Sequence, residues 1–344
     1  MPFEPFSSGS DGWRCDQGHR LTLWSVDDFQ RFWNALERAV DAPLGRKLMY
    51  AMADAEERIH GDAPSVGWFR KRARLQQALR VRRQRMGWGK LDLDAKTVSQ
   101  GVLPFVEMGT VLAHEEHLSG RRFNLEWNQP TASTLRYALT QRNEAMVAAP
   151  VPPVFGWSTH SIKSNDSWEH GIDVDERIVG WFINEQRCFF MPSSVFSYLA
   201  ASLQTVEFSP PMLSAVGLTV EGLATTEERV FSSLCWSSFQ ACINSQRMVF
   251  FHTSDELGGV LNTHHRRLGL GSINVDEFKD AATFVLVGCG EHTPISMGWL
   301  MGLLVMGSGH RLQAHLVLKP NEWRLEINPE KISYVGAENA SPQP

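Results

Sequence analysis

The sequence has few cysteines, and their arrangement is not that of a cross-linked scaffold or a metal-binding knuckle. The 344 residues contain five cysteines, at positions 15, 188, 235, 242 and 289. Their number is odd, they are widely separated, and no two form a Cys-x-x-Cys pair. The sequence therefore indicates neither a disulfide framework nor a zinc knuckle, and it favours reduced thiols inside the cell.

Long apolar segments are also missing. The longest strongly apolar run, ISMGWLMGLLVM, covers residues 295–306, whereas a helix that spans a bilayer needs about 20 residues. The first residues, MPFEPFSSGSDGW, have neither the basic start nor the apolar core of a signal peptide. We therefore expect a cytoplasmic protein without a membrane span, in which residues 295–306 form a buried helix.

The common sequence signatures of catalysis are absent as well. The chain contains no Gly-x-Ser-x-Gly elbow, no P-loop and no kinase signature. Residues 87–89 (GWG) and 269–271 (GLG) lack the third glycine of a dinucleotide-binding motif and precede predicted strands. No catalytic residue is predicted and no cofactor is indicated, so the sequence leans away from an enzyme without excluding one. The net charge of −5 argues against a general attraction to nucleic acid.

What the chain does contain is a set of three matches between its two halves, in the same order. The matched ranges are 20–36 with 187–203, 85–93 with 267–275, and 108–122 with 297–311. The first is a short apolar run followed by an amphipathic helix, with Ser25 and Ser193 as expected N-caps. The second, Arg-h-Gly-h-Gly (h is apolar) followed by alternating residues, predicts a turn and a strand. The third predicts a helix that ends at Gly120 or Gly309 and is followed by a strand.

These matches predict a duplicated chain of the α/β (α+β) class, in which each of two domains has helices packed on a small antiparallel sheet. A Pro-rich segment, residues 149–157, is the expected start of a linker. The predicted divisions are an N-terminal tail at 1–17, a first repeat at 18–148, a linker at 149–175, a second repeat at 176–333 and a C-terminal tail at 334–344.

One cluster in the first repeat has the residue types of a metal site. His114, Glu115, Glu116 and His117 follow one another near the end of a predicted helix. The two histidines share a helix face, but two ligands are too few for zinc, and the spacing of the His-Glu-x-x-His motif is absent. The matched positions 303–306 are Leu, Leu, Val and Met, so the halves do not share such a site. We expect a solvated helix face, with His114 and His117 as weak metal candidates.

The order of these predicted elements resembles one known family. It is a helix, Arg-x-Gly-h-Gly and a strand, then a Gly-containing apolar helix that ends in Ser-Gly, and a further strand. Residues 87–93 and 108–127 in the first repeat, and 269–271 and 297–318 in the second, are similar to the 4-vinyl reductase domain. That domain shares a superfamily with the TRAPP-type vesicle-tethering subunits and the haem-based nitric oxide sensors. Residues 44–57 resemble the family's preceding helix.

The resemblance implies α/β domains that bind small or hydrophobic ligands and pair as dimers, so a tandem copy would be a pseudo-dimer within one chain. Family members usually carry metal-binding cysteines near the end of the domain, but residues 124–139 and 316–327 contain none. Cys235 and Cys242 lie on the wrong side of the motif to replace them, and no histidine matches the haem ligand of the sensors. Metal-linked activity of the family's kind is therefore not expected here.

The leading functional expectation is a non-enzymatic sensor or scaffold that binds a small hydrophobic molecule and contacts a protein partner. An apolar pocket is expected between the Gly-containing helix and the sheet of each repeat. The expected lining residues are Trp88, Met108 and Val111 in the first repeat and Leu270, Met297, Trp299 and Leu300 in the second. Ordinary core packing is the alternative explanation for each of these side chains. An enzyme acting on an aromatic or tetrapyrrole-like ligand is a further alternative.

A different functional expectation comes from a basic segment. Residues 63–91 contain no acidic residue, which is typical of a surface for nucleic acid or an acidic partner, with aromatic side chains available for stacking. The candidate contacts are Arg70, Arg74, Arg82, Arg83 and Arg85. A solvated helix over residues 69–85, with Leu75, Leu79 and Val81 facing inward, explains the same residues without a partner.

Residues 263–267, Thr-His-His-Arg-Arg, precede the second glycine pair. Adjacent histidines on a strand or in a turn point in different directions, so they are not expected to ligate one ion. We expect a turn at this place.

Overall fold

Most of the chain is described by the structure, a computed structural model. The described residues are 7–9, 12–62, 71–158, 175–177, 180–183, 185–245, 254–278, 282–287, 289–308, 310–319 and 322–334. The predicted features that fall outside them include Arg70 of the basic segment, the helix cap Gly309, residues 159–174 of the linker and residues 335–344 of the C-terminal tail. The elements form two halves, the first half (residues 7–141) and the second half (residues 175–334).

Among its described residues, the first half combines short strands with four helices. Its strands are β1 (Ser7–Gly9), β2 (Gly12–Arg14), β3 (Arg20–Ser25), β4 (Lys90–Asp92), β5 (Thr97–Ser99), β6 (Phe123–Thr131) and β7 (Thr134–Gln141). Its helices are α1 (Val26–Val40), α2 (Gly45–Gly61), α3 (Lys71–Met86) and α4 (Pro104–Ser119). In chain order, three strands are followed by three helices, a strand pair, a fourth helix and a final hairpin.

The second half follows the same order of elements with a few additions. Its matching strands are β8 (Asp175–Arg177), β9 (Gly180–Ile183), β10 (Gln186–Pro192), β12 (Ser272–Phe278), β13 (Ala282–Val287), β14 (His310–Lys319) and β15 (Glu322–Tyr334). Its helices are α5 (Ser194–Gln204), α6 (Thr225–Ile243), α7 (Ser254–Leu268) and α8 (Thr293–Ser308). The additions are the short helices η1 (Leu213–Val216) and η2 (Gly290–His292) and the strand β11 (Leu218–Glu221).

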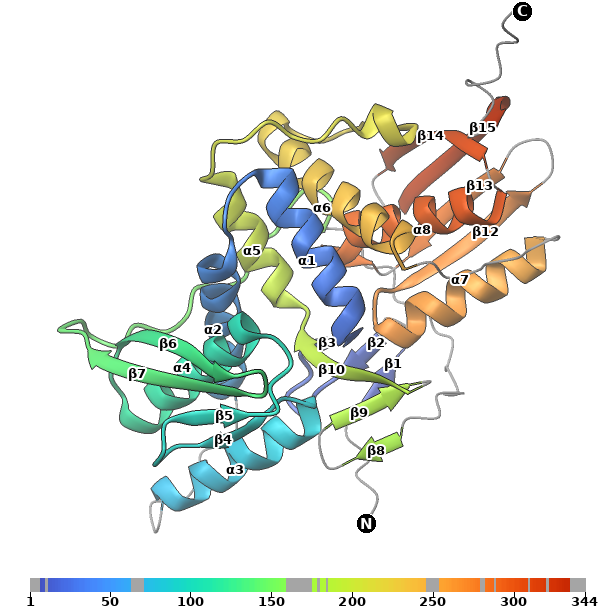
Figure 1. Cartoon of the computed structure of the whole chain (residues 1–344). Helices are drawn as coiled ribbons and strands as arrows, with labels where there is room; N and C mark the ends of the chain where they lie inside the picture. Colours follow the sequence, from blue (N-terminus) through green and yellow to red (C-terminus); the bar gives the residue numbers. More distant parts are fainter. Residues whose placement is uncertain are drawn as a thin grey trace, which may run out of the picture.

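The strands form three sheets, and one of these sheets joins the two halves (Figure 1). The strand order of this shared sheet is β1-β2-β3-β10-β9-β8, and Leu23 of β3 pairs with Phe190 of the antiparallel β10. The other sheets have the orders β4-β5-β7-β6 and β11-β14-β15-β13-β12. Their strand pairs are antiparallel except β11 with β14. The predicted α/β class, with helices packed on small antiparallel sheets, is confirmed.

Helix α1 shows the local signals that predicted it. The Ser25 hydroxyl accepts a hydrogen bond from the Asp28 amide at 3.1 Å, which satisfies one of the free N–H groups of the first turn. The predicted inward face is buried and consists of Phe29, Phe32, Trp33 and Leu36. The second expected cap is not formed, because the Ser193 side chain makes no capping hydrogen bond at α5.

Helix α4 ends at glycine, as predicted. Gly120 has a φ of 67°, a left-handed conformation that glycine adopts without the steric cost of a side chain. Its N–H donates to the Glu116 carbonyl at 2.8 Å. At the other end, Pro104 stands in the first turn, where a missing N–H costs no intrahelical hydrogen bond.

The glycines of the second sequence match make equivalent contacts across the two halves. Gly87 and Gly269 both have a φ of 74° and follow the ends of α3 and α7. A Cβ atom on Gly87 would meet the Cys188 carbonyl of β10, and one on Gly269 would meet the Leu21 carbonyl of β3. Each turn therefore lies directly against the central strand of the opposite half, and this close approach requires glycine.

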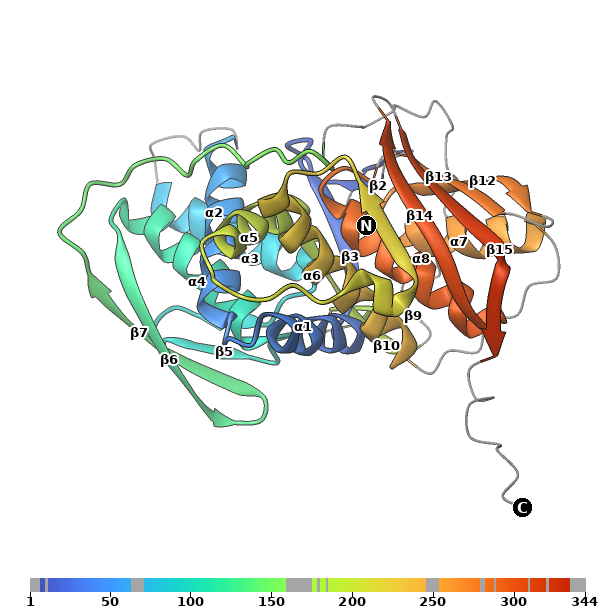
Figure 2. The same cartoon turned by 90° about the horizontal axis from the view of Figure 1, so that it is seen from above.

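Tryptophans and helices make similar reciprocal contacts between the two halves. The Trp181 Nε1–H donates to the Arg85 carbonyl at 2.5 Å, and the Trp13 Nε1–H donates to the Arg267 carbonyl at 2.8 Å. Helix α1 packs on α6, and helix α5 packs on α2; Figure 2 shows these four helices together in the middle of the molecule. The N-terminal segment of each half thus covers helices of the other half.

Two segments predicted to lie outside the repeats contribute to the core. The expected tail, residues 1–17, supplies β1 and β2 to the shared sheet, and its Trp13 is buried. In the expected linker, Trp157 is buried and stacks on Phe155 with ring centroids 4.5 Å apart. These aromatic side chains tie both segments to the folded body.

The apolar run at residues 295–306 forms most of α8 and is buried, as predicted. Met297, Leu300 and Met301 have no exposed surface, and α8 packs closely on α6. Among the helices of the described residues, none has the length and apolar character needed to cross a membrane.

Candidate functional site

The cluster at residues 114–117 has surroundings that differ from the predicted ones. His114 is completely buried, Glu115 and Glu116 are buried, and His117 is partly exposed. Helix α2 packs along α4 and covers this face. The prediction of a solvated helix face is therefore wrong, because the covering helix is distant in sequence from the helix that it covers.

The two glutamates of the cluster have structural partners. Glu115 Oε1 accepts hydrogen bonds from Lys96 Nζ at 2.5 Å and from the Tyr137 hydroxyl at 2.8 Å. Glu116 forms an ion pair with Arg122 at 2.6 Å. These contacts fix α4 to the neighbouring strands and to the turn that follows the helix.

His114 faces a carboxylate and a second histidine from α2. Glu56 and His60 are four residues apart on this helix and therefore share one face. Glu56 Oε2 lies 3.8 Å from His60 Nε2 and 4.0 Å from His114 Nε2. One ligand atom from each of the three buried residues lies within 4.8 Å of the other two. We name this group the Glu56–His60–His114 cluster.

The histidines of the cluster have nitrogen atoms without partners. Neither ring nitrogen of His114, nor Nε2 of His60, has a hydrogen-bond partner among the described residues, although an unpaired buried polar group costs about 1–3 kcal/mol. Burial and the Arg82 guanidinium lower the pKa of His60 well below its usual range. Burial and the adjacent His60 do the same to the pKa of His114. Both rings are therefore neutral at pH 7, which is the form that binds a metal ion.

Helix α3 contacts the cluster through Arg82. Arg82 donates from Nε and Nη2 to the two carboxylate oxygens of Glu56, at 2.7 and 2.6 Å. The Glu56 side chain is fully buried, so this bidentate pair supplies the counter-charge that a buried carboxylate needs. Arg82 thereby holds Glu56 in one orientation.

The predicted basic surface is not assembled as one exposed face. Arg82 is used by Glu56, and Arg83 is buried, pairs with the buried Glu107 and donates to the Thr110 hydroxyl at 2.6 Å. Arg85 pairs with the exposed Asp16 at 2.9 Å, and Arg74 is exposed. Within the described part of α3, the charged side chains of this segment therefore bind the protein's own carboxylates as well as facing solvent.

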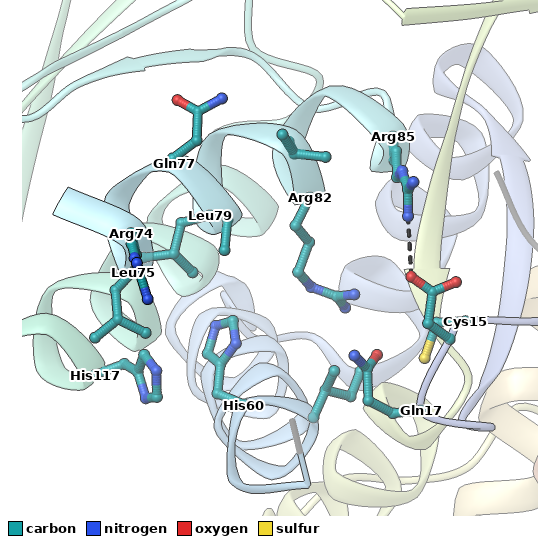
Figure 3. A pocket seen from close by; sticks show the side chains of 14 residues that line it. Cys15, Gln17, His60, Arg74, Leu75, Gln77, Leu79, Arg82, Arg85 and His117 are labelled. Atoms are coloured by element: carbon teal, nitrogen blue, oxygen red, sulfur yellow. Dashed lines mark hydrogen bonds and ion pairs between the residues drawn. The ribbon is translucent and has the colours of Figure 1, made fainter. Parts of the chain in front are cut away.

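A cavity of about 470 Å³ lies beside the cluster, between α2, α3 and the turn after β2 (Figure 3). Its wall includes the polar side chains of His60, His117 and Arg82, and the apolar residues Ile59, Leu75, Ala78, Leu79 and Val81. The rings of His60 and His117 stack with centroids 4.8 Å apart, and in Figure 3 Arg82 extends from α3 toward the side of His60. His60 therefore connects the cluster to this cavity.

A second cavity of about 670 Å³ lies along the other side of α3. Arg83, Trp88 and His114 belong to its wall, and Leu79 borders both cavities. The volumes of the two cavities fall within the range of small-molecule pockets, about 300–1,000 Å³. The cluster thus lies between two spaces, with one histidine facing each of them.

Of the predicted ligand-binding residues, Trp88 borders a described cavity and the others pack in cores. Met108 and Val111 are fully buried in the small core between α4 and its sheet. The second-half residues Leu270, Met297, Trp299 and Leu300 are buried in the main core.

The Thr-His-His-Arg-Arg segment is helical, and the prediction of a turn is wrong. Helix α7 continues to Leu268, so the chain turns only at Gly269. His265 is fully buried with its Nδ1 3.1 Å from the Leu261 carbonyl. Burial lowers the pKa of His265 to about 4, which makes it a neutral residue of the core.

Comparisons with models of protein families, with curated proteins and with solved structures find no match to this chain. The resemblance to the 4-vinyl reductase domain therefore stays a prediction.

Sequence reasoning identified His114 but not the residues that face it. Glu56 and His60 carried a usable signal, because they are four residues apart at the end of a segment with helical character. The sequence does not show that α2 and α4 pack face to face, and this packing brings the three side chains together.

Proposed function

We propose that the protein is a non-enzymatic sensor or scaffold that binds a small molecule in its first half, beneath helix α3. The observation that carries this proposal is the pair of cavities, about 470 and 670 Å³, that border α3 on both sides. Each cavity has the volume of a ligand pocket, and each reaches one histidine of the Glu56–His60–His114 cluster.

The lining of the smaller cavity favours a ligand with an apolar body and an anionic group. Its apolar residues lie on α3 and at the end of α2, and Arg74, Arg82 and Arg85 contribute guanidinium groups to the same wall. A guanidinium group binds a carboxylate or a phosphate through charge-assisted hydrogen bonds. An amphipathic anion can therefore contact both the apolar residues and the guanidinium groups of this cavity.

Helix α3 is suited to report whether a ligand is present, because charged contacts hold it to the body of the protein. Its sequence, KRARLQQALRVRRQRM, has no continuous apolar stripe. Its Arg82 and Arg83 instead bind the buried carboxylates of Glu56 and Glu107. A ligand that contacts these arginines changes how firmly α3 is held, and this change is the signal that we propose for a sensor.

We further propose that the two halves are duplicated units arranged as a pseudo-dimer. Leu23 and Phe190 occupy the same position in the first sequence match, and they pair with each other at the centre of the shared sheet. A local two-fold axis pairs a residue with its own counterpart in this way. The reciprocal contacts of Gly87 and Gly269 with the opposite central strands have the same symmetry.

Native mass spectrometry of the purified full chain, beside a denatured control, tests ligand binding directly. The proposal expects a bound small molecule that is lost on denaturation, or, for a ligand-free preparation, saturable binding of the amphipathic anionic dye anilinonaphthalene sulfonate. The chain offers a matched pair of variants for the dye experiment. Ala78 borders the smaller cavity, and Val260 is partly exposed on α7, the matching helix of the second half.

Ala78→Trp is expected to fill the cavity and reduce the affinity for the dye at least about tenfold, which corresponds to about 1.4 kcal/mol of binding free energy. Val260→Trp adds the same side chain to the second half and is expected to leave the affinity unchanged. A clean ligand-free mass together with equal dye binding by both variants would contradict a ligand site beneath α3.

A further inference from the structure

We propose that Glu56, His60 and His114 bind one divalent first-row transition-metal ion between α2 and α4. Their donor atoms are two imidazole nitrogens and one carboxylate oxygen, a set that zinc, iron and cobalt ions accept. The three residues come from two helices that pack directly on each other. All three side chains are buried, so water competes poorly for the same position.

The distances within the cluster are close to those of a metal site. A zinc ion about 2.1 Å from each donor atom holds neighbouring donors about 3.4 Å apart. Glu56 Oε2 is 3.8 Å from His60 Nε2 and 4.0 Å from His114 Nε2, so small side-chain rotations bring these atoms into contact with one ion. The Nε2 atom of each histidine then gains the partner that the described protein atoms do not provide.

The surroundings of the cluster support its geometry in two ways. Arg82 donates two hydrogen bonds to Glu56, and hydrogen bonds of this kind orient metal-binding carboxylates. Gly109 of α4 lies against Met49 and Met52 of α2. The missing side chain at Gly109 lets the two helices approach closely, which places their side chains within reach of one ion.

The charge of the site predicts which kind of ligand completes the coordination of the metal ion. Arg82 already balances the charge of Glu56, so a divalent ion adds two positive charges that no protein ligand of the cluster compensates. Three protein ligands also leave a fourth position open on zinc. His60 connects the cluster to the cavity of about 470 Å³, so we place an anionic ligand from that cavity at the open position. This last step rests on the proposed function, whereas metal binding by the three residues does not.

The experiment titrates the chelator-treated full chain with zinc by calorimetry and measures bound zinc by elemental mass spectrometry. Wild-type protein is expected to bind one zinc ion per chain with micromolar or tighter affinity. The matching position in the second half is Leu303, which excludes an equivalent second site. Cobalt in place of zinc is expected to give visible d–d absorption without a thiolate charge-transfer band, because the ligands are nitrogen and oxygen atoms.

The variants His60→Gln and His114→Gln each remove one ligand and are expected to weaken zinc binding more than about 100-fold. His292→Gln is the matched control, since His292 is a fully buried histidine of the second half outside the cluster, and it is expected to keep wild-type affinity. If circular dichroism shows that His114→Gln does not fold, His60→Gln at the cavity wall decides the question.

Two results would overturn the metal site: no zinc bound by the wild-type chain, or wild-type zinc affinity in a folded ligand variant. In the first case the cluster holds an ordered water instead. The Ala78→Trp variant separates this proposal from the proposed function, because a filled cavity removes the dye and leaves zinc bound. If zinc binds and the dye does not, the metal site stands without the small-molecule site. If the dye binds and zinc does not, the small-molecule site stands without the metal site.

Discussion

The two halves of the molecule use the same framework around interiors of different chemistry. In the first half, α2 and α4 enclose Glu56, His60 and His114. In the second half, α6 and α8 occupy the matching places, and the buried residues there include Cys242 and Leu303. The framework depends on strand pairing and close glycine contacts that both halves share, whereas the chemistry depends on a few side chains at one helix interface. A site can therefore be present in one half without a change of fold.

A second difference lies at the ends of α3 and α7. The Trp88 amide donates to the Arg83 carbonyl at 3.1 Å, and the Leu270 amide donates to the His265 carbonyl at 2.9 Å, so the two turns have the same backbone hydrogen bond. Arg83 is charged and pairs with Glu107, while His265 is neutral and fully buried. The first half thus buries an ion pair where the second half buries uncharged groups.

The largest expected effect comes from breaking that ion pair. Glu107→Ala leaves Arg83 as an uncompensated buried charge, which is expected to lower the free energy of unfolding by about 3–5 kcal/mol. Ser296→Ala, close to His265 in the second half, removes one hydrogen bond from a hydroxyl to the Leu270 carbonyl and is expected to cost about 1 kcal/mol. Urea unfolding followed by tryptophan fluorescence compares the two variants. Equal losses would show that the ion pair does not distinguish the halves.

The second prediction concerns acid sensitivity in the second half. Burial lowers the pKa of His292 to about 4, from 6.5 in an unfolded chain. The unfolded state therefore binds the proton first, and the stability from this histidine is complete above pH 6.5 and is lost as the pH falls toward 4. The loss amounts to about 3 kcal/mol at the acid end. His292→Gln is expected to flatten this part of a curve of unfolding free energy against pH, and an unchanged slope would contradict it.

The third prediction concerns what the halves share. Gly109 lies against Met49 of α2, and Gly298 lies against the Cys235 carbonyl of α6. Gly109→Ala and Gly298→Ala both place a methyl group in a closed helix contact, so each is expected to cost about 1–3 kcal/mol. Thermal unfolding of both variants tests the expectation of similar losses. A large loss for one glycine alone would show that the two helix pairs are not equivalent.

The smallest effect is expected at the surface of the first half. The Arg85–Asp16 ion pair is exposed, with 66% of the Asp16 side chain accessible to solvent. Such pairs contribute about 0–1 kcal/mol, so Asp16→Asn is expected to leave the urea midpoint nearly unchanged. Because salt screens exposed charges, the small effect of this substitution is expected to decrease further in high salt. A loss as large as that of Glu107→Ala would show that this pair is structurally as important as the buried one.

The parts of the fold that were predictable from sequence are those set by local chemistry. Ser25 and Gly120 mark the beginning of α1 and the end of α4 because a hydroxyl cap and a left-handed glycine act within one helical turn. Leu79 is buried on α3 as predicted. The α/β class follows from the same local patterns, because each helix and strand has its own period of apolar residues.

The parts that were not predictable depend on contacts between distant segments. His114 looked solvated because the sequence around it is polar, but α2 covers it. Arg82 and Arg83 looked like a surface for an acidic partner, but their partners are Glu56 and Glu107 of the same chain. A basic residue has the same local pattern whether its carboxylate lies in another molecule or in another helix of its own, so sequence alone does not separate the two cases.

The pairing of β3 with β10 also has a consequence for how the chain is made. The strand at residues 20–25 pairs with β2 on one side, but it receives its second partner only when residues 186–192 have been synthesised. Contacts between residues so far apart slow folding, and until then one edge of β3 is unpaired and of the kind that associates with other chains. The whole first half is therefore synthesised before the shared sheet that contains β3 can form completely. We expect the nascent chain to depend on chaperones for longer than its length alone would require.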